Sequence, residues 1–252
     1  MVTVNSYDLF AKFYDRLNYN EFSIQVVQYT DDILATLGFE GIRILDLACG
    51  TGTAAIWFAE QGYDVTAVDS SDSMIQTAKQ KARRLKIKVD FQKMDMRKME
   101  FSNQFDLAIC FFDSLNHLFK YTDFEKVIRN VSRSLKPNGK FLFDMITPYK
   151  LSTQWNHSIR HENNGNLSLI LTSEYKHKTH TAQITGRFLI RKGNRVQQYV
   201  RQFRNKAYTR IEIKRALAKA GLQLIHAYEC FSFDKPDAKS DRIFYVAQKT
   251  RN

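Results

Sequence analysis

Residues 42–52, with the sequence IRILDLACGTG, join a short apolar run to a turn of small residues. A helical pattern begins directly after the turn, at residues 53–61. Glycines at such a turn let the backbone approach a ligand closely, and the free N–H groups at a helix N-terminus attract anionic groups. The stretch therefore predicts a strand, a ligand-binding turn and a helix.

The same alternation continues along the first half of the chain. Apolar runs at residues 64–68, 89–92, 105–112 and 140–145 alternate with helical patterns. Such alternation predicts a parallel sheet with helices on both faces. Because ligands bind beyond the carboxyl ends of parallel strands, residues that directly follow the strands lie on one rim. These residues are Gly50, Asp69, Asp95 and Asp113.

The apolar period changes to two between residue 165 and about residue 204, which predicts three antiparallel strands. A helical pattern at residues 209–220 and apolar runs at 222–227 and 242–247 then return to the first pattern. We therefore expect two units. Residues 1–150 and 206–252 form the core, and residues 151–205 form an inserted β unit that covers the substrate.

Positive charge is concentrated in the second part of the chain. Of the formal charge of +12, residues 1–150 contribute none, with 19 basic and 19 acidic side chains, whereas residues 151–252 carry 19 basic and 7 acidic ones. An excess of this kind favours a surface for phosphates, nucleic acid or anionic lipid, and it is equally typical of a solvated surface that aids solubility. Bidentate binding of phosphate is a property of arginine, so Arg187 and Arg201 are candidate ligands for phosphate.

Several classes of protein are excluded by other features. Cys49, Cys110 and Cys230 are odd in number and widely spaced, which favours reduced thiols and no metal site. The N-terminal residues lack a signal-peptide pattern, and no apolar stretch approaches 18 residues. We expect a cytoplasmic protein that does not enter a membrane, and either a monomer or a homodimer.

Asp69 lies 17 residues after Gly52, at the end of the next predicted strand. A carboxylate at this position can accept hydrogen bonds from both hydroxyls of a ribose. Residues 50–55 also satisfy the loose dinucleotide pattern G-x-G-x-x-A. On these residues alone, S-adenosylmethionine and a nicotinamide dinucleotide are both candidate cofactors.

Over nearly the whole chain, the order and spacing of five motifs resemble those of the class I S-adenosylmethionine-dependent methyltransferases. The motifs are residues 45–52 (LDLACGTG), 68–69 (VD), 92–96 (QKMDM), 105–107 (FDL) and 135–140 (LKPNGK). The resemblance implies an α/β fold with a seven-stranded Rossmann-like sheet, helices on both faces and the last strand inserted antiparallel. It also implies S-adenosyl-L-methionine as the cofactor.

The resemblance further assigns the cofactor site. Ala48, Gly50 and Gly52 are expected to shape the methionine side, Asp69 to hold the ribose, and Asp95 with Met96 to border the adenine. The cofactor-binding residues that we expect are Tyr14, Tyr19, Asp46, Ala48, Cys49, Gly50, Gly52, Asp69, Ser70, Met74, Asp95, Met96 and Phe111.

A closer likeness is carried by residues 13–15 (FYD) and 110–118 (CFFDSLNHL). They are similar to a branch of small-molecule methyltransferases with a β insertion, which includes aminosugar N,N-dimethyltransferases. By that likeness Tyr14 and His117 are expected at the reaction centre. The acceptor-binding residues that we expect are Asp113, Asn116, His117, Arg187 and Arg201. The branch often has a histidine shortly before an Ala-Tyr pair, where this chain has Phe203.

Methyl transfer from a sulfonium is an in-line displacement, so the protein chiefly holds the nucleophilic atom close to the methyl group. His117 is the best candidate for a base that removes the acceptor's proton. Our leading hypothesis is a methyltransferase acting on N or O of a small, anionic molecule. The alternatives are an RNA methyltransferase that binds phosphates with the basic insert, and an S-adenosylmethionine-binding module without catalysis.

Overall fold

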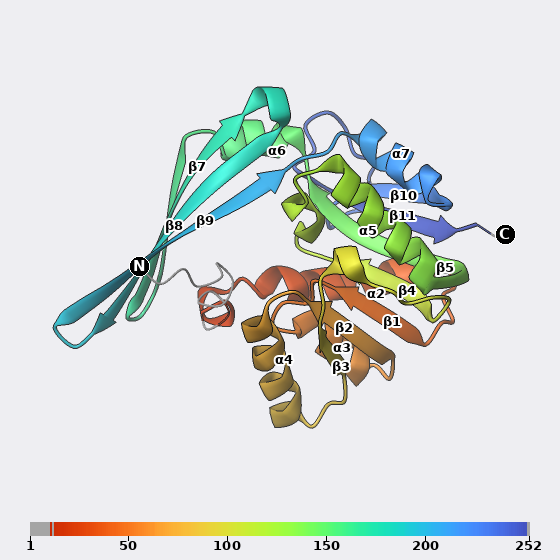
Figure 1. Ribbon diagram of the computed structural model, residues 1–252, viewed down its shortest axis with the longest axis horizontal. Helices are drawn as coiled ribbons and strands as arrows, with labels where there is room; N and C mark the ends of the chain where they lie inside the picture. The colour runs from red at the N-terminus through yellow and green to blue at the C-terminus, as the bar shows by residue number, and fades with distance from the viewer. Residues whose placement is uncertain (1–10, 12, 251–252) are drawn as a thin grey trace.

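Strand β1 (Arg43–Leu47), the apolar run before the glycine-rich turn, lies inside a seven-stranded sheet in the computed structural model (Figure 1). The structure describes residue 11 and residues 13–250. The sheet order is β10-β11-β5-β4-β1-β2-β3, and β1 pairs in parallel with β2 and β4. The other six strands are β2 (Asp64–Asp69), β3 (Asp90–Lys93), β4 (Phe105–Cys110), β5 (Leu135–Ile146), β10 (Leu222–Glu229) and β11 (Arg242–Lys249).

Helices cover both faces of this sheet, as predicted. Helices α2, α3 and α4 bury their apolar side chains on one face, and α5 and α7 bury theirs on the other. Strand β11 lies antiparallel between β5 and β10, which confirms the predicted fold class. The helices are α2 (Glu21–Thr36), α3 (Thr53–Glu60), α4 (Asp72–Leu85), α5 (Tyr121–Ser134), α6 (Pro148–Gln154) and α7 (Arg210–Lys219), with short 3₁₀ helices η1 (Asp15–Leu17), η2 (Met96–Lys98), η3 (Ser114–His117) and η4 (His177–Thr179).

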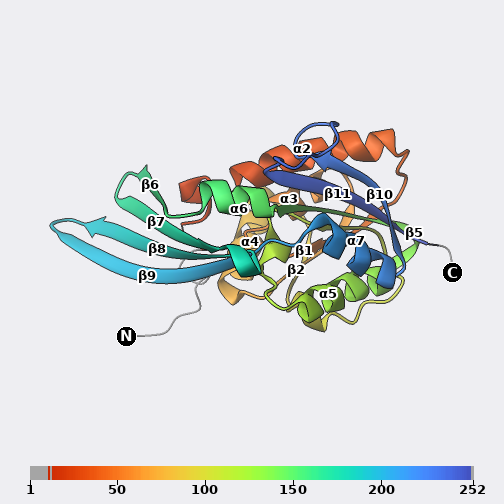
Figure 2. The same ribbon diagram turned by 90° about the horizontal axis from the view of Figure 1, so that it is seen from above.

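Four antiparallel strands form a second sheet, in the order β6-β7-β8-β9, which extends to the side of the core (Figure 2). They are β6 (Ser158–Asn164), β7 (Leu167–Lys176), β8 (Thr181–Lys192) and β9 (Arg195–Lys206). The alternating pattern predicted only three strands. Strand β6 was missed because its sequence, SIRHENN, has a single aliphatic side chain, Ile159, which is exposed. The division into a core and a substrate-covering unit stays a prediction.

The inner face of the second sheet is apolar. Leu169, Leu171, Ile184 and Phe188 are buried there, and aromatic residues of the N-terminal segment pack on the same cluster. Within the described residues 13–250, no helix is long and apolar enough to cross a membrane.

A buried ion network joins the two sheets. Nη2 of Arg242, on β11, lies 2.8 Å from Asp113 Oδ1, and Nη1 pairs with the fully buried Asp144 of β5. The backbone N–H groups of Phe112 and Asp113 donate to the Asp144 carboxylate, at 2.6 and 2.9 Å. Asn205, on β9, donates to Asp113 at 2.9 Å. The carboxyl ends of β4 and β5 are thereby tied to β11 and to the second sheet.

We predict that Arg242→Met lowers the free energy of unfolding by about 3 to 5 kcal/mol, because it leaves two buried carboxylates without their counter-charge. Urea denaturation of the variant and the wild type measures this difference. Arg43→Met is the matched control, since Arg43 pairs with Asp64 at the surface, where an ion pair contributes less than about 1 kcal/mol. Equal losses for the two variants would contradict the prediction.

Candidate active site

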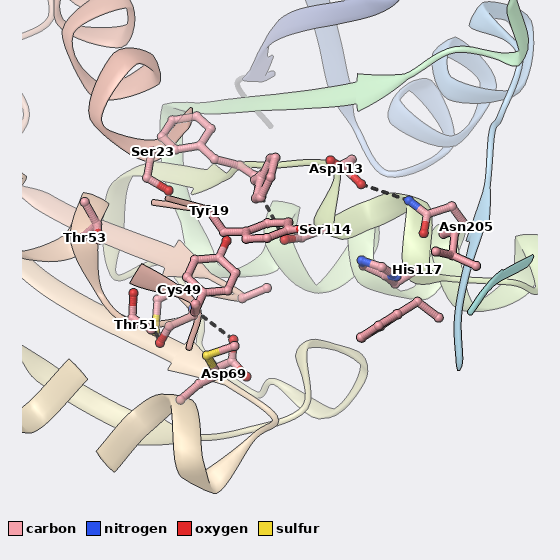
Figure 3. Close-up of a pocket in the computed structure, with 18 of the residues that line it drawn as sticks. Tyr19, Ser23, Cys49, Thr51, Thr53, Asp69, Asp113, Ser114, His117 and Asn205 are labelled. Carbon is pink, nitrogen blue, oxygen red and sulfur yellow. Dashed lines mark hydrogen bonds between the residues drawn. The ribbon is translucent and has the colours of Figure 1, made fainter. Parts of the chain in front are cut away.

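A cavity of about 450 Å³ lies between the carboxyl ends of the core strands and the inner face of the second sheet (Figure 3). At one end of the cavity lie Cys49, Thr51 and Asp69, and toward the other lie His117 and Asn205. Most of the predicted site residues line it: Tyr14, Tyr19, Asp46, Ala48, Cys49, Gly50, Asp69, Ser70, Met74, Met96, Phe111, Asp113 and His117.

The glycine-rich turn depends on backbone geometry that other residues rarely adopt. Gly50 and Gly52 have φ of 56° and 77°. A Cβ on Gly52 would lie 2.8 Å from the Cβ of Ala78 and 2.9 Å from the ring of Phe91, so no larger residue fits there without a shift of α4 or β3. Gly52 does not line the cavity, but it sets the path of the turn that does.

Two carboxylates lie beneath this turn. The carboxylate of Asp69 accepts from the backbone N–H groups of Gly50, at 3.0 Å, and Ser71, at 2.8 Å. Burial raises the pKa of Asp69 above its ordinary value. The two backbone hydrogen bonds oppose this rise but do not cancel it. Burial also raises the pKa of Asp46, as does the charge of Asp69, and among the described residues no group hydrogen-bonds to the buried Oδ2 of Asp46. Such an oxygen can accept from a ligand's hydrogen-bond donor.

The N-terminal segment closes one side of the cavity. The rings of Tyr14 and Tyr19 have centroids 5.6 Å apart, and the Tyr19 ring lies 6.4 Å from that of Phe112. The hydroxyl of Tyr19 donates to Oε1 of Glu162, on β6, at 3.2 Å. Tyr14 and Tyr19 thus connect the cofactor side of the cavity to the second sheet.

His117 lies in η3, just after β4, with its ring oriented by the second sheet. Nδ1 lies 3.1 Å from the carbonyl oxygen of Arg204, on β9. Because a carbonyl oxygen only accepts, Nδ1 carries the proton of this bond, and Nε2 is then the basic nitrogen of the neutral ring. The ring is therefore held in the tautomer that a general base requires.

Two further residues of the core that were predicted to contact a ligand, Asp95 and Asn116, do not line the cavity. Asp95 does not line the cavity, because its carboxylate accepts from the backbone N–H of Arg97 at 2.9 Å and pairs with the guanidinium of the same residue, which lowers the pKa of Asp95. The side-chain amide of Asn116 is fully buried, where it bonds with the backbone of Ile146 and donates to the carbonyl of Lys206. Asn116 therefore joins β5 to β9 and does not line the cavity.

The predicted arginines of the insert also lie outside the cavity lining. Side chains alternate along β8, so Arg187 points to the outer face, while its neighbour Phe188 points into the cavity. Arg201 is on the inner side of β9, but Nη1 donates to the carbonyl of Val200, and Nε is buried with no hydrogen-bond partner within residues 13–250. The period of two could have shown from the sequence that Arg187 faces outward.

Other charged residues of the cavity were missed: Lys150 on α6, Arg160 and Glu162 on β6, and Arg242 on β11. Arg160 and Glu162 share one face of their strand, but β6 has no apolar alternation that would predict it. Lys150 and Arg242 come from elements that are distant in sequence, and only the topology brings them together.

Comparison with known proteins identifies the class. A family model described as a methyltransferase domain matches residues 44–139. The chain is 32% identical over 246 residues to a Bacillus subtilis (strain 168) protein named "Putative methyltransferase YqeM", covering 97% of this chain and 98% of that protein. The chain belongs to this methyltransferase family.

Solved structures agree with this assignment. A crystal structure of an S-adenosylmethionine-dependent methyltransferase from Clostridium acetobutylicum is 25% identical, with a TM-score of 0.84, and covers 98% of this chain and 100% of that one. CalS10, an amino pentose methyltransferase from Micromonospora echinaspora solved with S-adenosylmethionine bound, has a similar fold, with 20% identity, a TM-score of 0.71 and 92% coverage of both chains. The protein is a class I S-adenosylmethionine-dependent methyltransferase.

The residues around the turn fit this cofactor. Apart from its chain neighbours, no described atom lies within 4 Å of a Cβ placed on Gly50, so the backbone there is open, and the Asp46 oxygen that has no hydrogen-bond partner in the described part of the chain suits the ammonium of a methionine moiety. Asp69 lines the cavity at the end of β2, and each of its carboxylate oxygens, which accepts one backbone N–H, has a further lone pair for a ribose hydroxyl. These individual roles are our predictions.

We predict that Asp69→Ala weakens binding of S-adenosylhomocysteine at least tenfold, or about 1.4 kcal/mol. The reason is that the variant cannot accept the two charge-assisted hydrogen bonds that we assign to the ribose hydroxyls. Calorimetric titration measures the affinity. Asp64→Ala, at the exposed start of the same strand, serves as the control and should bind as the wild type does. Unchanged affinity of the Asp69 variant would disprove its role at the ribose.

Proposed function

We propose that the protein transfers a methyl group to a nitrogen or oxygen of a small, anionic molecule by in-line displacement. The proposal rests chiefly on His117, whose ring is fixed by the carbonyl of Arg204 and faces a cavity shared with the cofactor-binding turn. When bound, S-adenosylmethionine supplies an electrophilic methyl group on its sulfonium.

His117 is the base in this proposal. An amine acceptor must lose a proton before it attacks, and a hydroxyl loses its proton during the attack. With Nδ1 bonded to a backbone carbonyl, Nε2 can receive that proton while the ring keeps its orientation. The second sheet, through Arg204, thus positions the base.

The cations of the cavity support an anionic acceptor. Arg242 is balanced by Asp113 and Asp144, whereas Nζ of Lys150 is 3.9 Å from its nearest carboxylate and Arg160 lies over the ring of Trp155, 5.4 Å from its centroid. Burial lowers the pKa of Lys150, and the charges of Arg242 and Arg160 lower it further, while the carboxylates of Asp241 and Asp113 act in the opposite direction. A carboxylate or phosphate between Lys150 and Arg160 would relieve this repulsion.

The apolar inner face of the second sheet supports a small acceptor with an apolar body. Leu169, Leu171, Ile184, Phe188 and Phe203 line the cavity on that side. These side chains can bury a ring or an aliphatic group, while Lys150 and Arg160 bind its charge. CalS10, which shares this fold, is a methyltransferase of an amino pentose, itself a small molecule.

Incubation of cell extracts with methyl-labelled cofactor, followed by mass spectrometry, tests the proposal. We expect the label in an anionic small molecule. The variant Lys150→Met/Arg160→Met should incorporate at least about tenfold less label, because each charge-assisted bond contributes roughly 1.5 to 3 kcal/mol, and should bind the cofactor as the wild type does. Label found only in RNA, with RNA binding that weakens steeply with salt, would favour the RNA methyltransferase instead.

We predict that His117→Ala slows label transfer about 100-fold or more, since a positioned base contributes about 10²- to 10⁴-fold. Its affinity for S-adenosylhomocysteine should stay within about twofold of the wild type, because a base acts on the acceptor. His161→Ala is the matched control, because His161 lies on the exposed outer side of β6. Turnover at the wild-type rate in the His117 variant would exclude the histidine from the mechanism.

A further inference from the structure

We propose that Asp15 and Lys81 are positioning residues that hold the N-terminal strap, defined as residues 13–20, closed over the cofactor side of the cavity. Lys81 is on α4 and does not itself line the cavity. Asp15 directly follows Tyr14, which does. The pair therefore acts on the cofactor through the groups that it holds in place.

The strap bridges the two sheets. Toward the second sheet, its aromatic residues pack on the apolar inner cluster, Nη2 of Arg16 donates to Asn166 at 2.9 Å, and the hydroxyl of Tyr19 donates to Glu162. Toward the core, the polar contacts of the strap centre on Asp15. Asp15 is thus the side chain that fastens the strap to the half of the molecule that carries the glycine-rich turn.

Asp15, Lys81, Thr51 and Thr53 form a compact polar cluster. Nζ of Lys81 lies 2.6 Å from Asp15 Oδ2 and donates to the hydroxyls of Thr51, at 3.2 Å, and Thr53, at 3.1 Å. The Thr51 hydroxyl in turn donates to Asp15 Oδ1, at 2.7 Å. The ammonium thereby uses all three of its hydrogens, and each hydroxyl accepts from the lysine.

The surroundings make this cluster stronger than an ordinary surface pair. The side chain of Lys81 is 16% exposed and that of Asp15 is 33% exposed, so water screens them less than it screens open ion pairs. Charge-assisted hydrogen bonds with this geometry are stronger than neutral ones. The cluster can therefore hold the strap against the core, in addition to the ring contact of Tyr19 with Phe112.

The position of the cluster links it to the cofactor. Thr51 lies between the two glycines of the turn, and Thr53 begins α3, whose N-terminus faces the cavity. The same ammonium thus fixes the turn on one side of the cofactor and the strap on the other. Loss of the pair would free Tyr14 and Tyr19 to move away, and the bound cofactor would dissociate faster.

The test measures dissociation of S-adenosylhomocysteine from the full chain by stopped-flow fluorescence after mixing with excess S-adenosylmethionine. Asp15→Asn keeps the shape of the side chain, removes the negative charge that pairs with Lys81 and leaves the bonds between Lys81 and the two threonines, so it weakens the hold on the strap while keeping the turn. We expect its dissociation rate to rise about tenfold, because most changes in affinity appear in the dissociation rate. Lys81→Met should raise the rate by at least as much.

The double variant Asp15→Asn/Lys81→Met distinguishes a shared role from two separate ones. If the two residues act through one cluster, the double variant should dissociate no faster than Lys81→Met alone. In steady-state assays the KM for the cofactor should rise while kcat at saturating cofactor stays within about threefold, a split that a general loss of stability would not produce.

Arg84→Met, on the exposed side of the same helix, is the matched control and should leave the dissociation rate unchanged. A rise of less than threefold in Asp15→Asn would overturn the proposal, and so would rate increases that multiply in the double variant. The dissociation measurement involves no methyl acceptor, so its failure would leave the proposed acceptor chemistry untouched.

Discussion

The guanidinium of Arg242 lies between the carboxylates of Asp113 and Asp144, and the end of the cavity near His117, which we propose as the acceptor half of the site, is built around it. Asp144 also binds two successive backbone N–H groups, which holds Phe112 and Asp113 at φ of 55° and 48°, a region that such residues rarely occupy. The turn that results directs the chain into η3, where His117 lies. The buried charges thus specify a backbone path that local propensity would not choose.

The cofactor half was predictable from the sequence because its features are local. A strand, a turn with Gly50 and Gly52, and a carboxylate after the next strand follow one another within 28 residues, 42–69, and each position has a direct physical reason. Besides Gly52, which shapes the turn without lining the cavity, Asp95 is a predicted cofactor-binding residue that lies outside the lining. Its position after β3 was predicted correctly, but its carboxylate pairs with Arg97 and does not line the cavity. An arginine two residues after an aspartate is too common a pattern to predict this ion pair from the sequence.

The acceptor half was less predictable because it is assembled from distant parts of the chain. Lys150, Arg160 and Arg242 come together only through the order of the strands, and the mostly polar β6 has no pattern that predicts a strand. For the same reason, the net charge of the insert did not predict which cations line the cavity. The chain has a large positive excess after residue 150, but Arg187 and other exposed arginines point outward, and the cations that reach the cavity are few.

One consequence of the bond between His117 and the carbonyl of Arg204 concerns how such an enzyme can change. The imidazole belongs to the core, but its orientation comes from a backbone atom of β9, whatever side chain stands at that position. A shift in the twist or length of the second sheet would turn the His117 ring and change the shape of the cavity at the same time. Asp46 and Asp69, next to the glycine-rich turn, would keep their positions. In the acceptor site that we propose, changes in the inserted sheet could therefore alter which acceptor is preferred. The backbone of the cofactor half would keep its shape.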